Sequence, residues 1–98
     1  MAAYAIVDMT VTDPVKIEEY RGLAGASVAA YGGKFLARGG RTEVVDGDWE
    51  PRRIVVIEFP DWERAKRWRA SPEYAKACAV RDQAARTRML LVDGAGAS

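Results

Sequence analysis

Two glycine pairs, Gly32-Gly33 and Gly39-Gly40, bracket a short apolar segment and constrain how this chain can fold. Glycine enters the left-handed backbone region without steric cost, so the first pair is typical of a helix end. The second pair falls inside a strand-like run, where glycine indicates a bulge or a close backbone approach. Because a bulge redirects its neighbours, Arg38 is the first side chain to consider for contact with a ligand.

Hydrophobic periodicity predicts the order strand, helix, strand, strand, helix, strand. Asp13-Pro14 supplies a cap and a first-turn proline for the first helix, which should end at Gly32-Gly33. Ser71-Pro72 repeats this device, so the second helix should kink or restart there. This order predicts a ferredoxin-like α+β sandwich, a four-stranded antiparallel sheet with two helices on one face. The expected strands are 3–11, 34–45, 53–59 and 87–93, within a single domain over residues 1–94 and a flexible tail at 95–98.

The chain of 98 residues contains no histidine, no asparagine and a single cysteine, Cys78. Without histidine, the usual general base and the imidazole metal ligand are both missing. One thiol cannot form a redox pair or an intrachain disulfide. We therefore expect no metal and no cofactor. Any catalysis must use Asp, Glu, Tyr, Arg, Lys, Ser or Thr, or be carried out by the substrate itself.

Basic residues outnumber acidic ones eight to three between residues 62 and 88, although the net charge is only +1. This could indicate a polyanion partner, but pairs such as Glu63 with Arg67 at i,i+4 spacing favour a solvated helix face. RNA recognition motifs share the predicted order of elements, yet they stack bases on exposed aromatic residues of the sheet. Here the third strand offers only Phe59, so no nucleic-acid partner is expected. No apolar run approaches the ~20 residues that span a bilayer, which predicts a cytoplasmic protein without a membrane partner.

The predicted strands carry apolar residues at both parities, for example Val55 and Ile57 against Ile54 and Val56. A solvent-facing antiparallel strand should instead alternate with polar residues. The face of the sheet that the helices leave open therefore needs a cover, and a self-complementary partner is the commonest one. We expect a homodimer in which two sheets pack face to face around an enclosed interior.

Strand parity also predicts which polar residues enter that interior. If the apolar set of the first strand faces the helices, Asp8 points the other way, and parity places Glu58, Arg38 and Arg88 on the same side. A few polar groups converging in an apolar cavity are typical of small-molecule sites. Alternatively, these four charges only pair with one another, and a register slip of one residue would reverse the assignment. Tyr31, Gly39 and Gly40 are further candidates for this site.

Several separated segments resemble the domain-of-unknown-function 1330 (DUF1330) family. They are YGGKFLARGG at 31–40, GDWEPRRIVVIEFP at 47–60, WRASPEY at 68–74, and the opening Asp13-Pro14. The resemblance covers nearly the whole chain and implies a dimeric α+β barrel, akin to small monooxygenases, muconolactone isomerases and stress-responsive barrel proteins. It implies no reaction, because the family has no agreed activity. Arg38, Trp49, Trp68 and Tyr74 match recurring positions of the family, which favours Arg38 as a ligand-binding residue.

The expected function is therefore binding of a small organic acid or aromatic molecule in the dimer cavity. Arg38 would hold a carboxylate, enolate or phenolate oxygen, and Asp8 or Glu58 could act as a general base. Cofactor-independent oxygenation of an aromatic and isomerisation of a lactone or enol are the two reactions considered, although the missing asparagine counts against a close copy of known barrel monooxygenases. The alternative is a non-catalytic dimeric module with a filled interior, which serves assembly or regulation.

Overall fold

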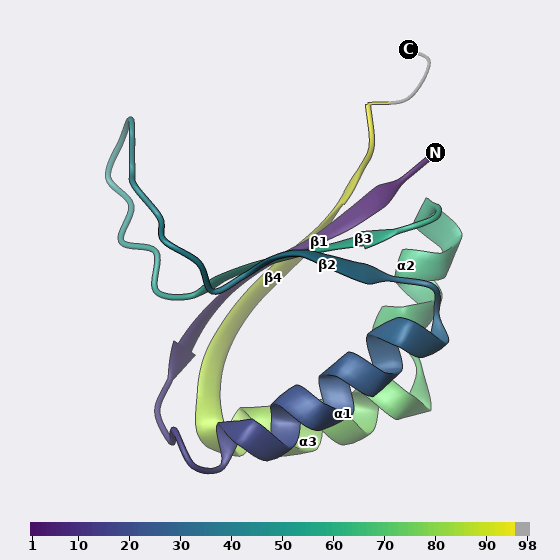
Figure 1. Cartoon of the computed structure of the whole chain (residues 1–98), viewed down its shortest axis with the longest axis horizontal. Coiled ribbons are helices and arrows are strands. Elements are labelled where there is room, and N and C mark those ends of the chain that lie inside the picture. The colour runs from purple at the N-terminus through teal and green to yellow at the C-terminus, as the bar shows by residue number, and fades with distance from the viewer. Residues whose placement is uncertain (96–98) are drawn as a thin grey trace.

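A four-stranded antiparallel sheet with strand order β2-β3-β1-β4 forms one layer of the molecule, and three helices form the other (Figure 1). The computed structural model describes residues 1–95. The predicted ferredoxin-like sandwich is confirmed, with one helix more than expected; the predicted tail at 95–98 lies outside the described residues except for residue 95. Among the described residues, none of the helices combines the length and apolar character needed to traverse a bilayer. The elements in order are β1 (Ala3–Val11), α1 (Ile17–Ala30), β2 (Lys34–Arg38), β3 (Ile54–Phe59), α2 (Trp62–Arg69), α3 (Pro72–Ala84) and β4 (Ala85–Asp93).

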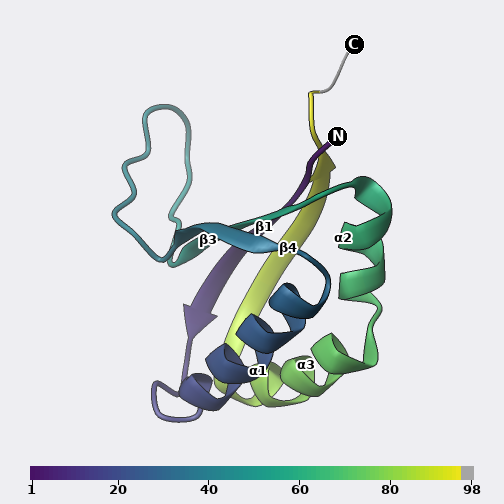
Figure 2. The same cartoon turned by 45° about the vertical axis from the view of Figure 1, so that its right-hand side comes forward.

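The second predicted helix is two helices, because Ser71-Pro72 restarts it. The carboxylate of Asp61 accepts a hydrogen bond from the N–H of Arg64 at 2.7 Å and caps α2. The hydroxyl of Ser71 accepts one from the N–H of Tyr74 at 3.1 Å and caps α3. Pro72 occupies the first turn of α3, where a missing N–H costs little. The restart lets α3 lie beside α1 beneath the sheet (Figure 2).

Strand β2 is shorter than predicted. The expected strand 34–45 ends at Arg38, because Gly39 adopts a φ of +73°, outside the extended region. The N–H of Gly39 donates to the carbonyl of Ile54 at 2.8 Å, next to the last β2–β3 pair. Residues 39–53 then form a long loop that stands away from the sheet (Figures 1 and 2). The predicted turn at Asp46-Gly47 lies within this loop, where Gly47 has a φ of +84°.

A β-bulge in β2 reverses the direction of the Arg38 side chain. Phe35 and Ala37 pair with consecutive residues of β3, which leaves Leu36 as the extra residue. Arg38 consequently pairs with Val55, whose side chain is buried beneath the helices. One extra residue moves every later side chain to the opposite face. The bulge was predicted at the second glycine pair, but it lies earlier in the strand, at a position without glycine.

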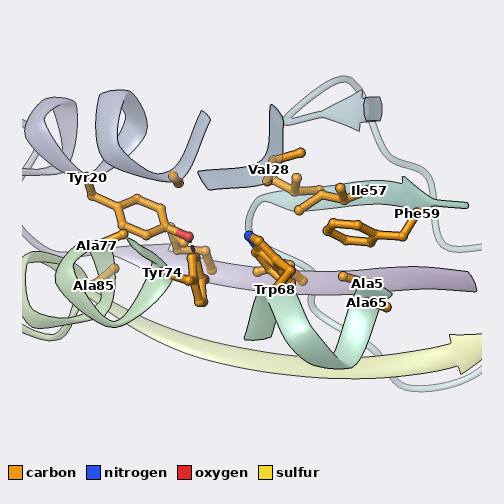
Figure 3. Close-up of a cluster of buried hydrophobic side chains, with 14 of the residues drawn as sticks. Ala5, Tyr20, Val28, Ile57, Phe59, Ala65, Trp68, Tyr74, Ala77 and Ala85 are labelled. Carbon is orange, nitrogen blue, oxygen red and sulfur yellow. Dashed lines mark hydrogen bonds between the residues drawn. The ribbon is translucent and has the colours of Figure 1, made fainter. Parts of the chain in front are cut away.

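The core lies between the helices and the sheet, and its largest members form an aromatic cluster of Phe59, Trp68 and Tyr74 (Figure 3). The Trp68 ring centroid lies 5.0 Å from that of Phe59 and 4.2 Å from that of Tyr74. The indole N–H of Trp68 donates to the Ser27 hydroxyl at 3.0 Å, which donates to the Ala24 carbonyl at 2.8 Å. The buried polar atoms of this region are therefore hydrogen-bonded. The predicted parity of the first strand is confirmed, since its buried residues are Ala3, Ala5, Val7 and Met9.

Candidate ligand-binding site

A small pocket lies on the helix-covered side of the sheet, between α1 and the strands β1, β2 and β3. Its volume is about 40 Å³, enough for a few water molecules. Three arginines, Arg21, Arg38 and Arg53, contribute to its lining and are called the arginine cluster below. The rest of the lining is mainly apolar and includes Val7, Met9, Val28, Phe35, Ile57 and Trp68.

Two of these arginines lie beside glycines, and one of them occupies space that a side chain would fill. The guanidinium carbon of Arg38 lies 4.0 Å from the centroid of the Phe35 ring, in cation–π geometry. One of its nitrogens lies 3.7 Å from the point that a Cβ would take at Gly25 of α1. The guanidinium of Arg53 lies directly against Gly39, where any side chain would collide with it. Gly39 thus serves both the left-handed turn after β2 and the placement of Arg53.

The arginine cluster carries more positive charge than its one neighbouring acid, Glu18, balances. Arg21 pairs with Glu18 one turn earlier on α1. Within residues 1–95, neither Arg38 nor Arg53 forms an ion pair with a carboxylate within 4.0 Å. Burial lowers the pKa of Arg53, and the neighbouring charges of Arg21 and Arg38 lower that pKa further. Like charges held together in a partly buried site attract an anion, which would relieve their repulsion.

Tyr20 lines the pocket from α1, and its hydroxyl belongs to a buried hydrogen-bonded network (Figure 3). The hydroxyl oxygens of Tyr20 and Tyr74 lie 2.9 Å apart, and Arg81 donates to the Tyr74 hydroxyl at 3.3 Å. Arg81 also donates two hydrogen bonds to the carboxylate of Asp82, at 3.2 and 3.1 Å. Burial raises the pKa of both tyrosines, so both are neutral at neutral pH. The network fixes the Tyr20 ring, and the charge available to a ligand in the pocket comes from the arginine cluster.

The structure separates the four charged residues that strand parity had grouped. Arg38 lies on the helix-covered side, whereas Asp8, Glu58 and Arg88 lie on the face that the helices leave uncovered, here called the open face. The expectation that Arg38 shares one cavity with the other three is wrong. The extra residue at Leu36 shifts the alternation by one, and the sequence carries no local sign of it.

Asp8, Glu58 and Arg88 do not converge on one point of the open face. Glu58 pairs across strands with Lys34, whose ammonium nitrogen lies 3.4 Å from its carboxylate. Asp8 accepts a hydrogen bond from the backbone N–H of Arg52 at 3.0 Å and lies opposite Arg88 in the β1–β4 register. Each of the two acids therefore has a partner within this chain.

Two further candidates, Tyr31 and Gly40, lie outside the pocket. The hydroxyl of Tyr31 donates to the carboxylate of Glu73 at 3.2 Å and links the end of α1 to α3. At Gly40, a Cβ would meet no atom within 4 Å, so nothing packs against this residue closely. Of the predicted residues, Arg38 lines the pocket and Gly39 lies beside it, in contact with Arg53.

Sequence reasoning did not assign Arg21 and Arg53 to the site. A signal for Arg21 was present, because it follows Ile17 by one helical turn and so lies next to the buried stripe of the first helix. Arg53 gave a weaker signal, since a basic residue at the start of an apolar strand is common on protein surfaces. Its contact with Gly39 depends on the pairing of β2 with β3, which is not a local property of the sequence.

These features define a ferredoxin-like α+β protein with a cationic pocket between α1 and the sheet. A protein of unknown function from Rhodopseudomonas palustris is similar with a TM-score of 0.73, at 16% identity over 95% of this chain and 82% of the other. SnoaB, a cofactor-independent oxygenase from Streptomyces nogalater, gives a TM-score of 0.68 at 16% identity, over 95% of this chain and 92% of its own. A dimeric ferredoxin-like protein of unknown function from Thermobifida fusca gives a TM-score of 0.63 at 14% identity, over 96% of this chain and 92% of its own.

At these identities the structural similarity shows the fold alone. The family is shown by a separate comparison, in which the model described as Domain of unknown function (DUF1330) matches residues 2–95. The chain belongs to the DUF1330 family, and the predicted resemblance is confirmed. No curated protein matches this chain significantly.

Proposed function

We propose that this chain binds a small organic acid in the pocket between α1 and the sheet, with the acid group at the arginine cluster. The observation that carries this proposal is that Arg38 and Arg53 lack a carboxylate partner within residues 1–95, although both line an apolar pocket. Guanidinium groups bind carboxylate oxygens in bidentate geometry, and apolar walls accept a hydrocarbon body. The ligand class that fits both features is an aliphatic or aromatic acid.

The ligand must displace the Arg38 side chain in order to enter. A cavity of about 40 Å³ is too small for an aromatic ring, since benzene occupies an engineered cavity of about 150 Å³. Arg38 is exposed and lies over the Phe35 ring. A rotamer change of Arg38 would therefore enlarge the pocket and uncover that ring at little cost in free energy. The ligand ring would then stack on Phe35 while the guanidinium follows the carboxylate.

Two reactions fit such a site, if the protein is an enzyme. The arginine cluster would stabilise an enolate or phenolate oxygen as it does a carboxylate, so the ligand itself could supply the reactive carbon. Oxygenation of an electron-rich aromatic is one version, and the shared fold of SnoaB supports considering it. Isomerisation of a lactone or enol is the other. Asp8 and Glu58 lie across the sheet from the pocket, so neither is proposed as the base.

The open face supports a homodimer. Leu90 and Val92 are 58% and 44% exposed there, and the partly buried Ile6 and Val56 extend the same apolar surface. An apolar sheet face of this kind needs a cover, and a second copy provides one by symmetry. The dimeric description of the Thermobifida fusca protein, which shares the fold, supports this arrangement.

The alternative function is a non-catalytic dimeric module. The ion pair of Glu58 with Lys34 on the open face favours it, because a filled dimer interior requires its charges to be paired within the protein. In that case the protein functions in assembly or regulation through its open-face dimer, and the arginine cluster binds no metabolite.

Isothermal titration with benzoate, hydroxybenzoates and short aliphatic acids tests the proposal. We expect at least one acid to bind, and Arg38→Ala to weaken that binding by about tenfold to a hundredfold, since a hydrogen bond to a charged group contributes ~1.5–3 kcal/mol. Arg67→Ala is the control, because Arg67 is exposed on α2 and does not line the pocket. Equal affinity of the Arg38 and Arg67 variants would refute the role of Arg38. A dimer that binds none of these acids would favour the non-catalytic module.

A further inference from the structure

The loop of residues 39–53 is long for a connection between two paired strands. It joins β2 to β3 without a helix or strand of its own, whereas such connections usually have two to five residues. In both views it projects away from the helices and extends beyond the rest of the domain (Figures 1 and 2). A loop of this length in a small domain usually has a binding role.

This loop exposes large apolar side chains. Val45 is 84% exposed and Trp49 is 55% exposed, and together with Pro51 and Ile54 they line an open groove of about 530 Å³. Tryptophan is enriched in protein interfaces, where a few such residues carry most of the binding energy. The loop therefore presents a surface suited to another protein.

The apolar groove of the loop continues onto the open face of the sheet. Ile54 lines the groove, begins β3 and lies opposite Asp8, so its side chain shares the face of Val56 and Leu90. A second copy that covers the open face would consequently lie next to the loop. The same partner could bury both surfaces.

The charges of the loop and of β4 are complementary. Between Arg41 and Arg52 the loop carries no basic residue and four acids. Glu50 pairs with Arg52 of its own chain at 3.8 Å, whereas the other three, Glu43, Asp46 and Asp48, form no ion pair within residues 1–95. Arg86 and Arg88 are exposed on the open face, and within residues 1–95 neither forms an ion pair with a carboxylate within 4.0 Å. Complementary charges of this kind orient partners at an interface.

We propose that the loop of residues 39–53 is an arm that clasps a second copy of this chain. Trp49 and Val45 pack against the second copy, and Asp46 and Asp48 of the loop face Arg86 and Arg88 of the second copy. This inference rests on the proposed open-face dimer and is independent of ligand binding in the pocket.

Val45 has a matched control in Val15, which is also 84% exposed but lies before α1, away from the loop. Sedimentation equilibrium of Val45→Asp, Trp49→Ala and Val15→Asp would measure the dimer dissociation constant. We expect the two loop variants to raise this constant about tenfold or more, and Val15→Asp to leave it unchanged. Because all three positions are exposed, circular dichroism should show a folded chain in each case. Unchanged dimerisation of both loop variants would refute the arm and leave the dimer in place.

A charge exchange tests whether the contact joins two copies. One chain carries Asp46→Lys and Asp48→Lys, and the other carries Arg86→Glu and Arg88→Glu. If the loop of one copy meets β4 of the other, each variant repels itself and the mixture forms mainly heterodimers, which native mass spectrometry separates by mass. A random mixture of homodimers and heterodimers would overturn the charge contact between copies. A wild-type chain that is monomeric at all concentrations would refute both arm and dimer, whereas acid binding in the pocket would still be measurable.

Discussion

The aromatic end and the arginine end of the layer between helices and sheet adjoin at Trp68, which lines the pocket, and they differ in how completely they are packed. At one end, each residue of the aromatic cluster is 0% exposed, and the polar atoms around it are hydrogen-bonded. At the other end, the arginine cluster surrounds a pocket, and two of its members, Arg38 and Arg53, form no ion pair with a carboxylate within residues 1–95. Burial of unbalanced charge does not stabilise a fold. The aromatic end therefore maintains the structure, whereas the arginine end is where the proposed ligand would bind.

Replacing Trp68 with alanine should cause the largest loss of stability. Its side chain is fully buried between Phe59 and Tyr74, and removal also leaves the Ser27 hydroxyl without its donor. We expect the free energy of unfolding to fall by about 3–5 kcal/mol in urea at fixed protein concentration. Trp49→Ala is the control and should change it by less than about 0.5 kcal/mol in the monomer, because Trp49 is exposed. Similar losses for both variants would contradict the division between the two ends.

Tyr74→Phe, also at the aromatic end, should lower the free energy of unfolding less than Trp68→Ala does. The change removes the hydroxyl that lies 2.9 Å from that of Tyr20 and accepts a hydrogen bond from Arg81. Leaving buried polar groups unpaired costs about 1–3 kcal/mol. Tyr31→Phe removes only an exposed hydrogen bond to Glu73 and should be nearly neutral in a urea titration. A neutral Tyr74→Phe would mean that water replaces the missing partner.

The two buried tyrosines should also make stability fall in alkaline solution. Burial raises the pKa of Tyr20 and Tyr74 above the ordinary value near 10, so the unfolded chain releases these protons at a lower pH than the folded chain does. The stabilisation is fully present below about pH 10 and decreases as the pH rises above it. Urea titrations between pH 8 and 11 would measure the slope, which should be shallower in Tyr74→Phe. Equal slopes in the wild-type protein and in Tyr74→Phe would exclude Tyr74 as a source of the loss of stability at alkaline pH.

Close packing can be tested with two glycines. A Cβ at Gly33 would lie 2.7 Å from a Phe59 ring carbon and 2.8 Å from a Val28 methyl carbon, so Gly33→Ala should destabilise by about 1–3 kcal/mol. Gly22 lies within α1 with no atom within 4 Å of such a Cβ. Gly22→Ala should therefore stabilise by about 0.4–1 kcal/mol. Thermal unfolding of the two variants would show whether the space around a glycine decides if its replacement by alanine destabilises or stabilises the fold.

Local signals in the sequence were sufficient for most of the fold and insufficient for the site. The alternation in β1 and the restart at Ser71-Pro72 were predicted, because each depends on neighbouring residues. The bulge at Leu36 depends on how β2 pairs with β3, and it decides which side of the sheet Arg38 reaches. The single residue most strongly favoured from sequence was thus placed on the wrong face. The contact of Arg53 with Gly39 also depends on the pairing of β2 with β3, and it was not predicted.

Arg38→Ala should give the smallest change in stability and the largest change in ligand binding. Arg38 is exposed, and its positive charge lowers the pKa of Arg53, so its removal relieves repulsion while losing the contact with Phe35. We expect these effects to cancel to within about 0.5 kcal/mol in a urea titration, while the affinity for an organic acid falls tenfold or more. A loss of more than 1–2 kcal/mol of stability would mean that Arg38 is part of the packed structure, and the arginine end would then no longer differ in kind from the aromatic end. Stability that is kept while binding is lost would identify Arg38 as a residue retained for its ligand, since the fold gains nothing from its charge.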